Sequence, residues 1–160
     1  MKIATALMCI AFLLTACGST PEPPATPPVA AKSAPPPEVA DHTSLFPDAG
    51  KVATHIVPDH ILDLKALPGG SLADYDVKGK KYQMFIIDTD SAQTAAFMML
   101  DVKAAMKKDP EYISYMGGYA GMHGDKPIYC FSKLHYVAGI FGLPKAQADP
   151  LAIELAAQLH

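Results

Sequence analysis

The side chains of this sequence that are best suited to chemistry are sulfur and imidazole groups around the glycine-rich stretch 117–124. Met116, Met122 and His123 lie within this stretch or beside it, and thioether sulfur together with imidazole nitrogen suits Cu(I). The thiol of Cys130 could approach from the strand that we expect to follow. The sequence has no Met-x-Met or Cys-x-x-Cys repeat. Copper binding is therefore an alternative interpretation and not the leading one.

Two further pairs of side chains have the composition of a catalytic site. Cys130 and His135 could act as a thiol nucleophile and its base, but nothing in the sequence orients the imidazole, and a cysteine in a buried strand is usually inert. Asp88 and Asp90 are paired acids just before a predicted helix, where carboxylates act as helix caps. We therefore predict that the protein is not an enzyme.

Charge and composition make some partners and substrates less suitable. The formal net charge is −3, so the chain lacks the basic surface that nucleic acid requires, and we expect no nucleic-acid partner. The sequence contains no arginine, which normally supplies bidentate recognition of phosphate and carboxylate groups. Catalysis on phosphorylated substrates is therefore disfavoured.

The first 16 residues have the layout of an export signal. Lys2 precedes an apolar run from Ile3 to Leu14, which is shorter than the roughly 20 residues needed to cross a bilayer core. The run ends in Leu14-Thr15-Ala16-Cys17, which resembles the lipobox of bacterial lipoproteins. An ordinary cleaved signal peptide is the alternative interpretation.

The lipobox resemblance implies where the protein works. It implies that residues 1–16 are removed, and that Cys17 becomes an acylated first residue carrying fatty chains such as palmitate. The membrane would then be a partner through this covalent lipid, the only cofactor that we expect. Gly18 and Ser19 resemble outer-membrane sorting residues, which implies a place in the cell envelope, on the outer membrane and facing the periplasm.

Residues 17–40 are predicted to be a disordered tether. The stretch from Pro21 to Pro37 is rich in proline, and Val29 is its only large apolar residue. Proline lacks an amide donor and fixes φ, so such a stretch forms an extended spacer instead of a helix or a sheet. Cys9 would leave with the signal and Cys17 would carry lipid, which leaves Cys130 without a disulfide partner.

Residues 41–160 are long enough for one globular domain with one core. The clearest strand, from Tyr82 to Asp88, is apolar on both faces, which is typical of the centre of a sheet that is covered on both sides. We expect Asp90 or Ser91 to cap a helix that runs to about Lys108. Asp149-Pro150 should open a second helix as its N-cap and first residue.

The remaining pattern predicts an α+β fold. The expected order β-β-α-β-β-β-α gives an antiparallel sheet of about five strands with two main helices. Gly117 to Gly124 is interpreted as a loop. The other expected strands are short, at the start of 55–67 and at 71–77, 112–116, 127–131 and 135–141.

Phe97 is a possible interaction residue. On the first predicted helix it lies nearly opposite the apolar stripe and beside Asp101. We expect the N-terminal segment of the chain to cover it, because large apolar side chains are usually buried. If it is exposed instead, it is a candidate contact for a partner.

Residues from Phe85 to Phe97 resemble the strand-then-helix signature of a secreted bacterial family of unknown function, whose members read x-V-x-x-Y-D-M-G-S-x-x-x-A-F-G. Gly118-Tyr119 and Tyr136-Val137 are similar to that family's G-Y and K-G-x-Y-Y-V elements. The glycine after the family's Ala-Phe pair is Met98 here. The resemblance covers residues 45–160 and supports the α+β fold, and it implies no chemistry.

The leading functional expectation is a lipid-anchored, non-enzymatic domain of the cell envelope. It would act by binding an envelope protein or a small ligand at a distance from the membrane set by the tether. The alternative is a periplasmic copper-binding protein that uses Met116, Met122 and His123.

Overall fold

Seven strands pair into one antiparallel sheet in the computed structural model, which describes residues 38–65 and 67–160. Their order across the sheet is β1-β2-β3-β7-β6-β5-β4. The strands are β1 Lys51–Asp59, β2 Pro68–Val77, β3 Lys80–Asp88, β4 Lys107–Ile113, β5 Gly118–His123, β6 Lys126–Lys133 and β7 Tyr136–Phe141. The helices are α1 Ala92–Ala105 and α2 Lys145–Gln158, with 3-10 turns η1 Thr43–Leu45 and η2 Ile61–Asp63.

The predicted α+β class, with an antiparallel sheet and two main helices in a single small domain, is confirmed. The prediction of about five strands was too low. Neither helix of the described chain is long and apolar enough to cross a membrane.

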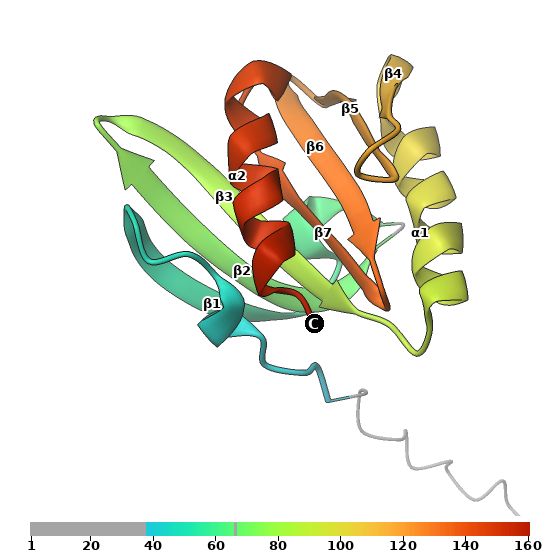
Figure 1. The fold of residues 1–160 in the computed structure, drawn as a ribbon, viewed down its shortest axis with the longest axis horizontal. Coiled ribbons are helices and arrows are strands. Elements are labelled where there is room, and N and C mark those ends of the chain that lie inside the picture. The colour runs from blue at the N-terminus through green and yellow to red at the C-terminus, as the bar shows by residue number, and fades with distance from the viewer. Residues whose placement is uncertain (1–37, 66) are drawn as a thin grey trace, which may run out of the picture. The chain divides into compact units, whose positions relative to one another are not determined.

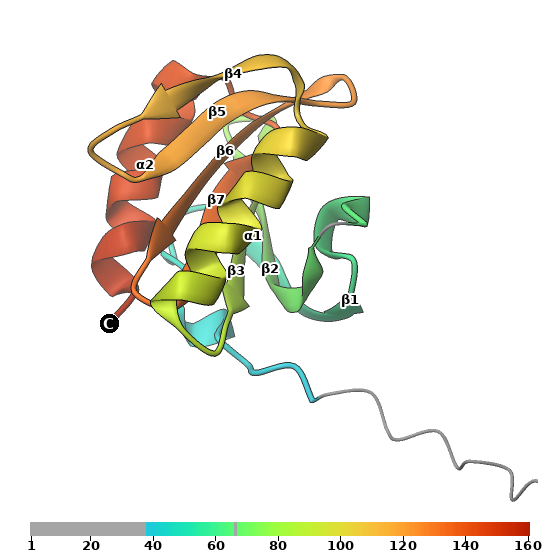
Figure 2. The same ribbon diagram turned by 90° about the vertical axis from the view of Figure 1, so that its right-hand side faces the viewer.

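The two helices cover opposite faces of the sheet (Figures 1 and 2). α2 contributes Ala148, Ala152 and Leu155 to one hydrophobic core. α1 contributes Ala95, Met99 and Val102 to the other, together with Ile61 of η2. The strands between the helices are therefore buried on both sides.

β3 lies in the interior of the sheet, as its two apolar faces predict. Met84 and Ile86 belong to the core under α2, while Phe85 and Ile87 belong to the core under α1. β3 pairs with β7, and Phe85 lies opposite Gly139. A Cβ at Gly139 would lie 2.9 Å from the Phe85 ring and 2.2 Å from the Tyr129 carbonyl, so this position requires glycine.

The interpretation of Gly117–Gly124 as a loop was wrong, because most of it forms β5. Only the flanking Gly117 and Gly124, both with φ +60°, use the left-handed region. A Cβ at Gly118 would lie 2.3 Å from the Cys130 carbonyl, and one at Gly121 would lie 2.9 Å from the Met106 sulfur. The glycines inside β5 therefore permit close approach of neighbouring groups.

The start of α1 agrees with the sequence prediction, and its end does not. Ser91 is the N-cap, and its hydroxyl accepts a hydrogen bond from the Thr94 amide at 3.1 Å. The helix ends at Ala105, and Lys107 and Lys108 begin β4 instead of closing the helix. The strand expected at 112–116 is thus displaced toward the N-terminus.

The second helix also begins earlier than the sequence predicts. α2 starts at Lys145 with Pro144 as its N-cap residue, so Pro150 lies inside the helix. Asp149 is not a cap. Its carboxylate accepts hydrogen bonds from the hydroxyls of Tyr115 and Tyr129, the latter at 2.7 Å. These bonds tie α2 to β6 and to the β4–β5 turn.

The two residues proposed as caps of α1 can be distinguished by substitution. Ser91→Ala should lower the free energy of unfolding by about 1 kcal/mol, because the Thr94 amide loses its acceptor. Asp90→Ala should change it by about 0.5 kcal/mol or less, as at an ordinary surface position. Urea denaturation of both variants measures the difference, and a larger loss in Asp90→Ala would contradict the assignment.

Candidate functional site

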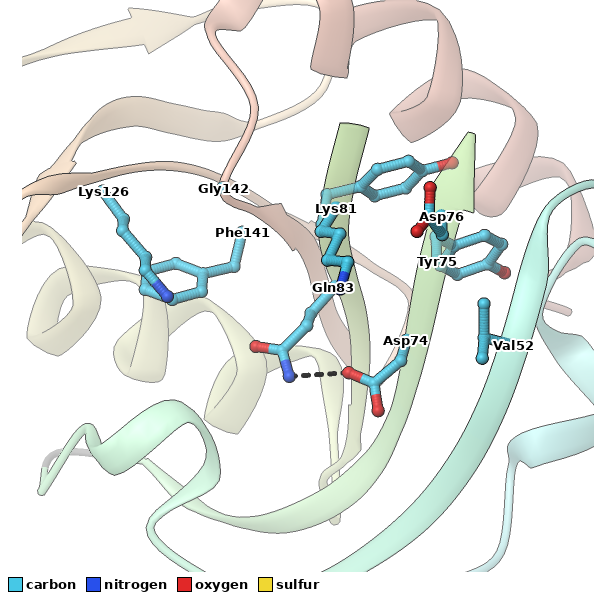
Figure 3. Close-up of a pocket in the computed structure, with 10 residues that line it drawn as sticks. Val52, Asp74, Tyr75, Asp76, Lys81, Gln83, Lys126, Phe141 and Gly142 are labelled. Carbon is cyan, nitrogen blue, oxygen red and sulfur yellow. Dashed lines mark hydrogen bonds between the residues drawn. The ribbon is translucent and has the colours of Figure 1, made fainter. Parts of the chain in front are cut away.

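An open hollow of about 480 Å³ lies at the end of the sheet where the β2–β3 hairpin turns. Its lining comes from β1, β2, β3 and the ends of β6 and β7, as Figure 3 shows. The lining residues are Val52, Asp74, Tyr75, Asp76, Lys81, Tyr82, Gln83, Lys126, Phe141 and Gly142. The hollow therefore combines charged, amide and aromatic groups.

The hollow occurs where one face of the sheet changes from apolar to polar. On β3, Phe85 and Ile87 belong to the core under α1, but Gln83, the next residue on that face, does not. On β2 the same change runs from Leu72 to Asp74. Gln83 and Asp74 are paired across the two strands, and both are partly exposed.

Asp74 is the centre of a hydrogen-bond network on this face. Its Oδ1 accepts from Gln83 Nε2 at 2.8 Å, the bond drawn in Figure 3, and its Oδ2 lies 2.7 Å from His55 Nε2. Donation by Gln83 is the largest influence and lowers the pKa of Asp74, with a smaller lowering by His55, against desolvation that raises it. Asp74 is therefore an ionised, fixed acceptor at neutral pH.

A cationic and aromatic group forms the other side of the hollow. The Lys126 ammonium lies 5.4 Å from the centre of the Phe141 ring, within the range of a cation–π contact. The His123 ring lies 6.4 Å from the same ring. Its Nδ1 is buried and has no hydrogen-bond partner within the described residues.

Tyr75 and Tyr82 border the hollow but serve the core. They alternate with Asp74 and Gln83 along their strands, and their rings stack in the core under α2 with centres 4.9 Å apart. The Tyr75 hydroxyl donates to the Pro47 carbonyl at 2.7 Å. Burial is the main cause that raises the pKa of both tyrosines, so both rings stay neutral and structural.

The chemistry of the hollow favours binding. Its lining contains no serine, threonine or cysteine, and the hydroxyls of its two tyrosines belong to neutral core side chains, so the lining offers the His55–Asp74 pair no activated nucleophile. It offers instead a fixed carboxylate, an amide, the ammonium groups of Lys81 and Lys126 and an aromatic ring. Convergent polar groups beside an apolar surface are typical of a site that orients a ligand.

The structure does not bring together the three residues of the copper hypothesis. Met116 lies in the turn before β5, while Met122 and His123 are the last two residues of that strand. At about 3.3 Å per residue, a strand of this length separates its ends by roughly 17 Å. No group of three His, Cys, Asp or Glu residues is placed to hold a metal ion in the described part of the chain.

Cys130 and His135 are also apart. Cys130 is fully buried beneath α1, with its sulfur 3.7 Å from that of Met99, and burial raises the pKa of its thiol. Its register partner is Gly139, whereas His135 lies beyond the end of the β6–β7 ladder. The structure therefore does not place the Cys130 thiol beside the His135 imidazole.

Asp88 and Asp90 do not cap α1, whose cap is Ser91. Asp88 lies between two imidazoles, 2.9 Å from His42 Nε2 and 3.5 Å from His135 Nε2. Together with Glu38 and Asp59, the two aspartates line a second open hollow, of about 780 Å³. The contact between Asp88 and His42 connects the segment before η1 to the end of β3.

Phe97 is 59 % exposed, and Leu100, one turn further along α1, is 55 % exposed. Within the described residues Phe97 is therefore largely uncovered, while most of the N-terminal segment expected to cover it lies outside those residues, and its role as a partner contact stays a hypothesis. Cys17, the predicted lipidation site, lies outside the described residues.

Sequence reasoning missed the hollow, although one signal was present. Gln83 is on the same face as Phe85 and Ile87, and it interrupts the otherwise apolar or aromatic run from Tyr82 to Ile87. No such signal marks Lys126 or Phe141, because only the β3–β7 pairing brings them near Gln83.

Comparisons of the chain with protein-family models, with curated proteins and with solved structures found no match. The family resemblance described above thus stays an expectation, and the function must be argued from the site.

The Asp74 network predicts a measurable titration. Gln83→Leu should raise the pKa of Asp74 toward its ordinary value of 3.8, and His55→Ala should raise it less, because Gln83 is the larger influence. Carbon NMR of the Asp74 carboxyl group measures both shifts.

Because folding lowers the pKa of Asp74, ionised Asp74 stabilises the folded protein. The stabilisation by ionised Asp74 is complete above pH 3.8 and is lost as the pH falls through the lower value of the folded protein. An Asp74 pKa that does not move in Gln83→Leu would contradict the network.

Proposed function

We propose that this protein is a lipid-anchored component of the cell envelope, whose folded part binds a small ligand or a segment of an envelope protein in the hollow around Asp74 and Gln83. The observation that carries the proposal is the fixed carboxylate at the centre of that hollow, held by bonds of 2.7 and 2.8 Å. Side chains that such a carboxylate already orients lose little conformational freedom when a ligand binds.

The anchor part of the proposal is supported by the sequence. Leu14-Thr15-Ala16-Cys17 follows a basic residue and a short apolar run, and a proline-rich segment follows it. Two or three acyl chains hold a protein on a bilayer far more firmly than one. The folded part would then work near the outer membrane, on its periplasmic side.

The binding role is favoured over catalysis by the arrangement of the polar groups. The partner of His55 is Asp74, whose other oxygen accepts from Gln83, so these residues hold each other in place. Among the described groups that line the hollow, those outside these two hydrogen bonds are the Gln83 side-chain oxygen, the ammonium groups of Lys81 and Lys126, and the Phe141 ring. These groups recognise a ligand that combines an anionic or hydrogen-bonding part with an apolar part.

The anchor is tested by Cys17→Ser in cells fed labelled palmitate. We expect the variant to lose the label and to accumulate as uncleaved precursor, because the acyl chains are attached to the cysteine sulfur. Cys130→Ser is the matched control and should keep the label. Equal labelling of the Cys17→Ser variant and the parent would contradict the anchor and leave the binding site untouched.

The binding site is tested by placing a photo-crosslinking amino acid at position 81 in intact cells. Lys81 lines the hollow and is exposed, so the probe should form a specific adduct that mass spectrometry identifies. The same probe at Ile153, which is 51 % exposed on α2, is the control.

Asp74→Asn in the position-81 background should reduce the adduct, because Gln83 and His55 lose the ionised acceptor that orients them. An adduct pattern identical to that of position 153 would contradict the hollow as the binding site, whatever the outcome for Cys17.

A further inference from the structure

The two edges of the sheet differ in how they are protected against pairing with another strand. β4 is one edge, and its sequence Lys-Lys-Asp-Pro-Glu-Tyr-Ile carries four charged residues and Pro110. Its register with β5 is irregular between Lys107 and Glu111. Charges, proline and irregular register are the devices that prevent edge-to-edge association.

β1 is the other edge, and its protection is confined to its two ends, where Lys51, Pro58, Asp59 and the irregular register between Lys51 and Ala53 lie. Between Val52 and Val57 its only titratable residue is His55. Val52 is 68 % exposed and Ile56 is 42 % exposed. Within the described residues, β1 pairs only with β2, so its outer row of N–H and C=O groups has no strand partner. A regular, apolar, exposed edge is a template for a further strand.

We propose that β1 is a self-association surface, on which β1 of a second copy of this chain pairs antiparallel to join two sheets into one. The regular part of the β1–β2 ladder covers residues 53–57, after the irregularity between Lys51 and Ala53 and before Pro58. Its middle residue is His55. A twofold axis at His55 therefore pairs the whole regular segment with its copy.

The charges and apolar groups of β1 fit this arrangement. The strand begins with Lys51 and ends with Asp59, so antiparallel pairing brings unlike charges together at both ends and parallel pairing brings like charges together. Asp48 lies 2.7 Å from the Lys51 ammonium, and His60 lies 2.7 Å from Asp59, so these side chains are already held near the strand. In the antiparallel register Thr54 faces Ile56 of the copy, and Ala53 faces its Val57.

The test uses Thr54 and Ile56, which are both exposed and alternate with the residues on the His55 face. In the double variant Thr54→Lys/Ile56→Lys, each lysine faces a lysine of the copy. In Thr54→Glu/Ile56→Glu, each glutamate faces a glutamate. Directly opposed like charges destabilise a strand pair by up to about 1 kcal/mol each. Two such pairs should weaken self-association roughly tenfold or more.

The measurement is the molar mass of the full-length chain in mild detergent over a dilution series. We expect a concentration-dependent dimer for the parent chain, because an interface of one strand pair is small and therefore weak. Each double variant should be monomeric where the parent is dimeric. An equimolar mixture of the two variants should recover the dimer, because every lysine then faces a glutamate. Recovery in the mixture distinguishes strand pairing from misfolding of either variant.

Three outcomes would overturn the proposal. The parent chain could be monomeric throughout the series. Both double variants could dimerise as tightly as the parent, which would place the interface elsewhere. A different envelope protein could occupy β1 in cells while the purified chain does not self-associate. None of these outcomes depends on Cys17 or on the hollow.

Discussion

The pairing of β3 with β7 is the constraint on which the rest of this structure depends. These strands are far apart in the sequence, yet their register runs from Gln83 opposite Phe141 to Asp88 opposite Tyr136. The pair joins β1–β2–β3 to β7–β6–β5–β4 in one sheet. It is fixed by the Phe85 ring over Gly139, where no side chain would fit. Because the side chains of a strand alternate between faces, a shift of one residue would exchange the two cores.

The same pairing creates the hollow. It brings the end of β7, with Phe141, beside Gln83 and so connects the Asp74 network to Lys126. The core under α1 includes Phe85 and Leu72 but neither Gln83 nor Asp74. A partly exposed carboxylate can stay ionised at such a boundary if hydrogen bonds stabilise it, as those of Gln83 and His55 do here. The candidate site thus lies where the sheet leaves the cover of its core.

Sequence reasoning succeeded where a local pattern has one physical solution. The two apolar faces of residues 82–88 required cover on both sides, and the Ser91 hydroxyl was a suitable cap for the helix that follows. It failed where a distant contact decided the outcome. The Asp149-Pro150 pair predicts the start of a helix, yet the helix starts at Lys145, and Asp149 accepts hydrogen bonds from Tyr115 and Tyr129. The glycines of β5 are typical of a loop when only the local sequence is considered. The groups that require glycine there, the Cys130 carbonyl and the Met106 sulfur, come from other elements.

By itself the sequence determined the α+β class, the central place of β3 and the start of α1, since these follow from side-chain periodicity and local hydrogen bonding. It also contains Leu14-Thr15-Ala16-Cys17, whose resemblance to a lipobox is the basis of the proposed anchor. Only the tertiary structure decided that Met116 is held apart from His123 by a strand and that Cys130 is sealed beneath α1. The tertiary structure likewise decided that Asp74 forms hydrogen bonds with His55 and Gln83. The physical reason is that the chemistry of a side chain depends on its neighbours, and strand pairing decides which residues become neighbours. The register of that pairing is set by the packing of both cores together.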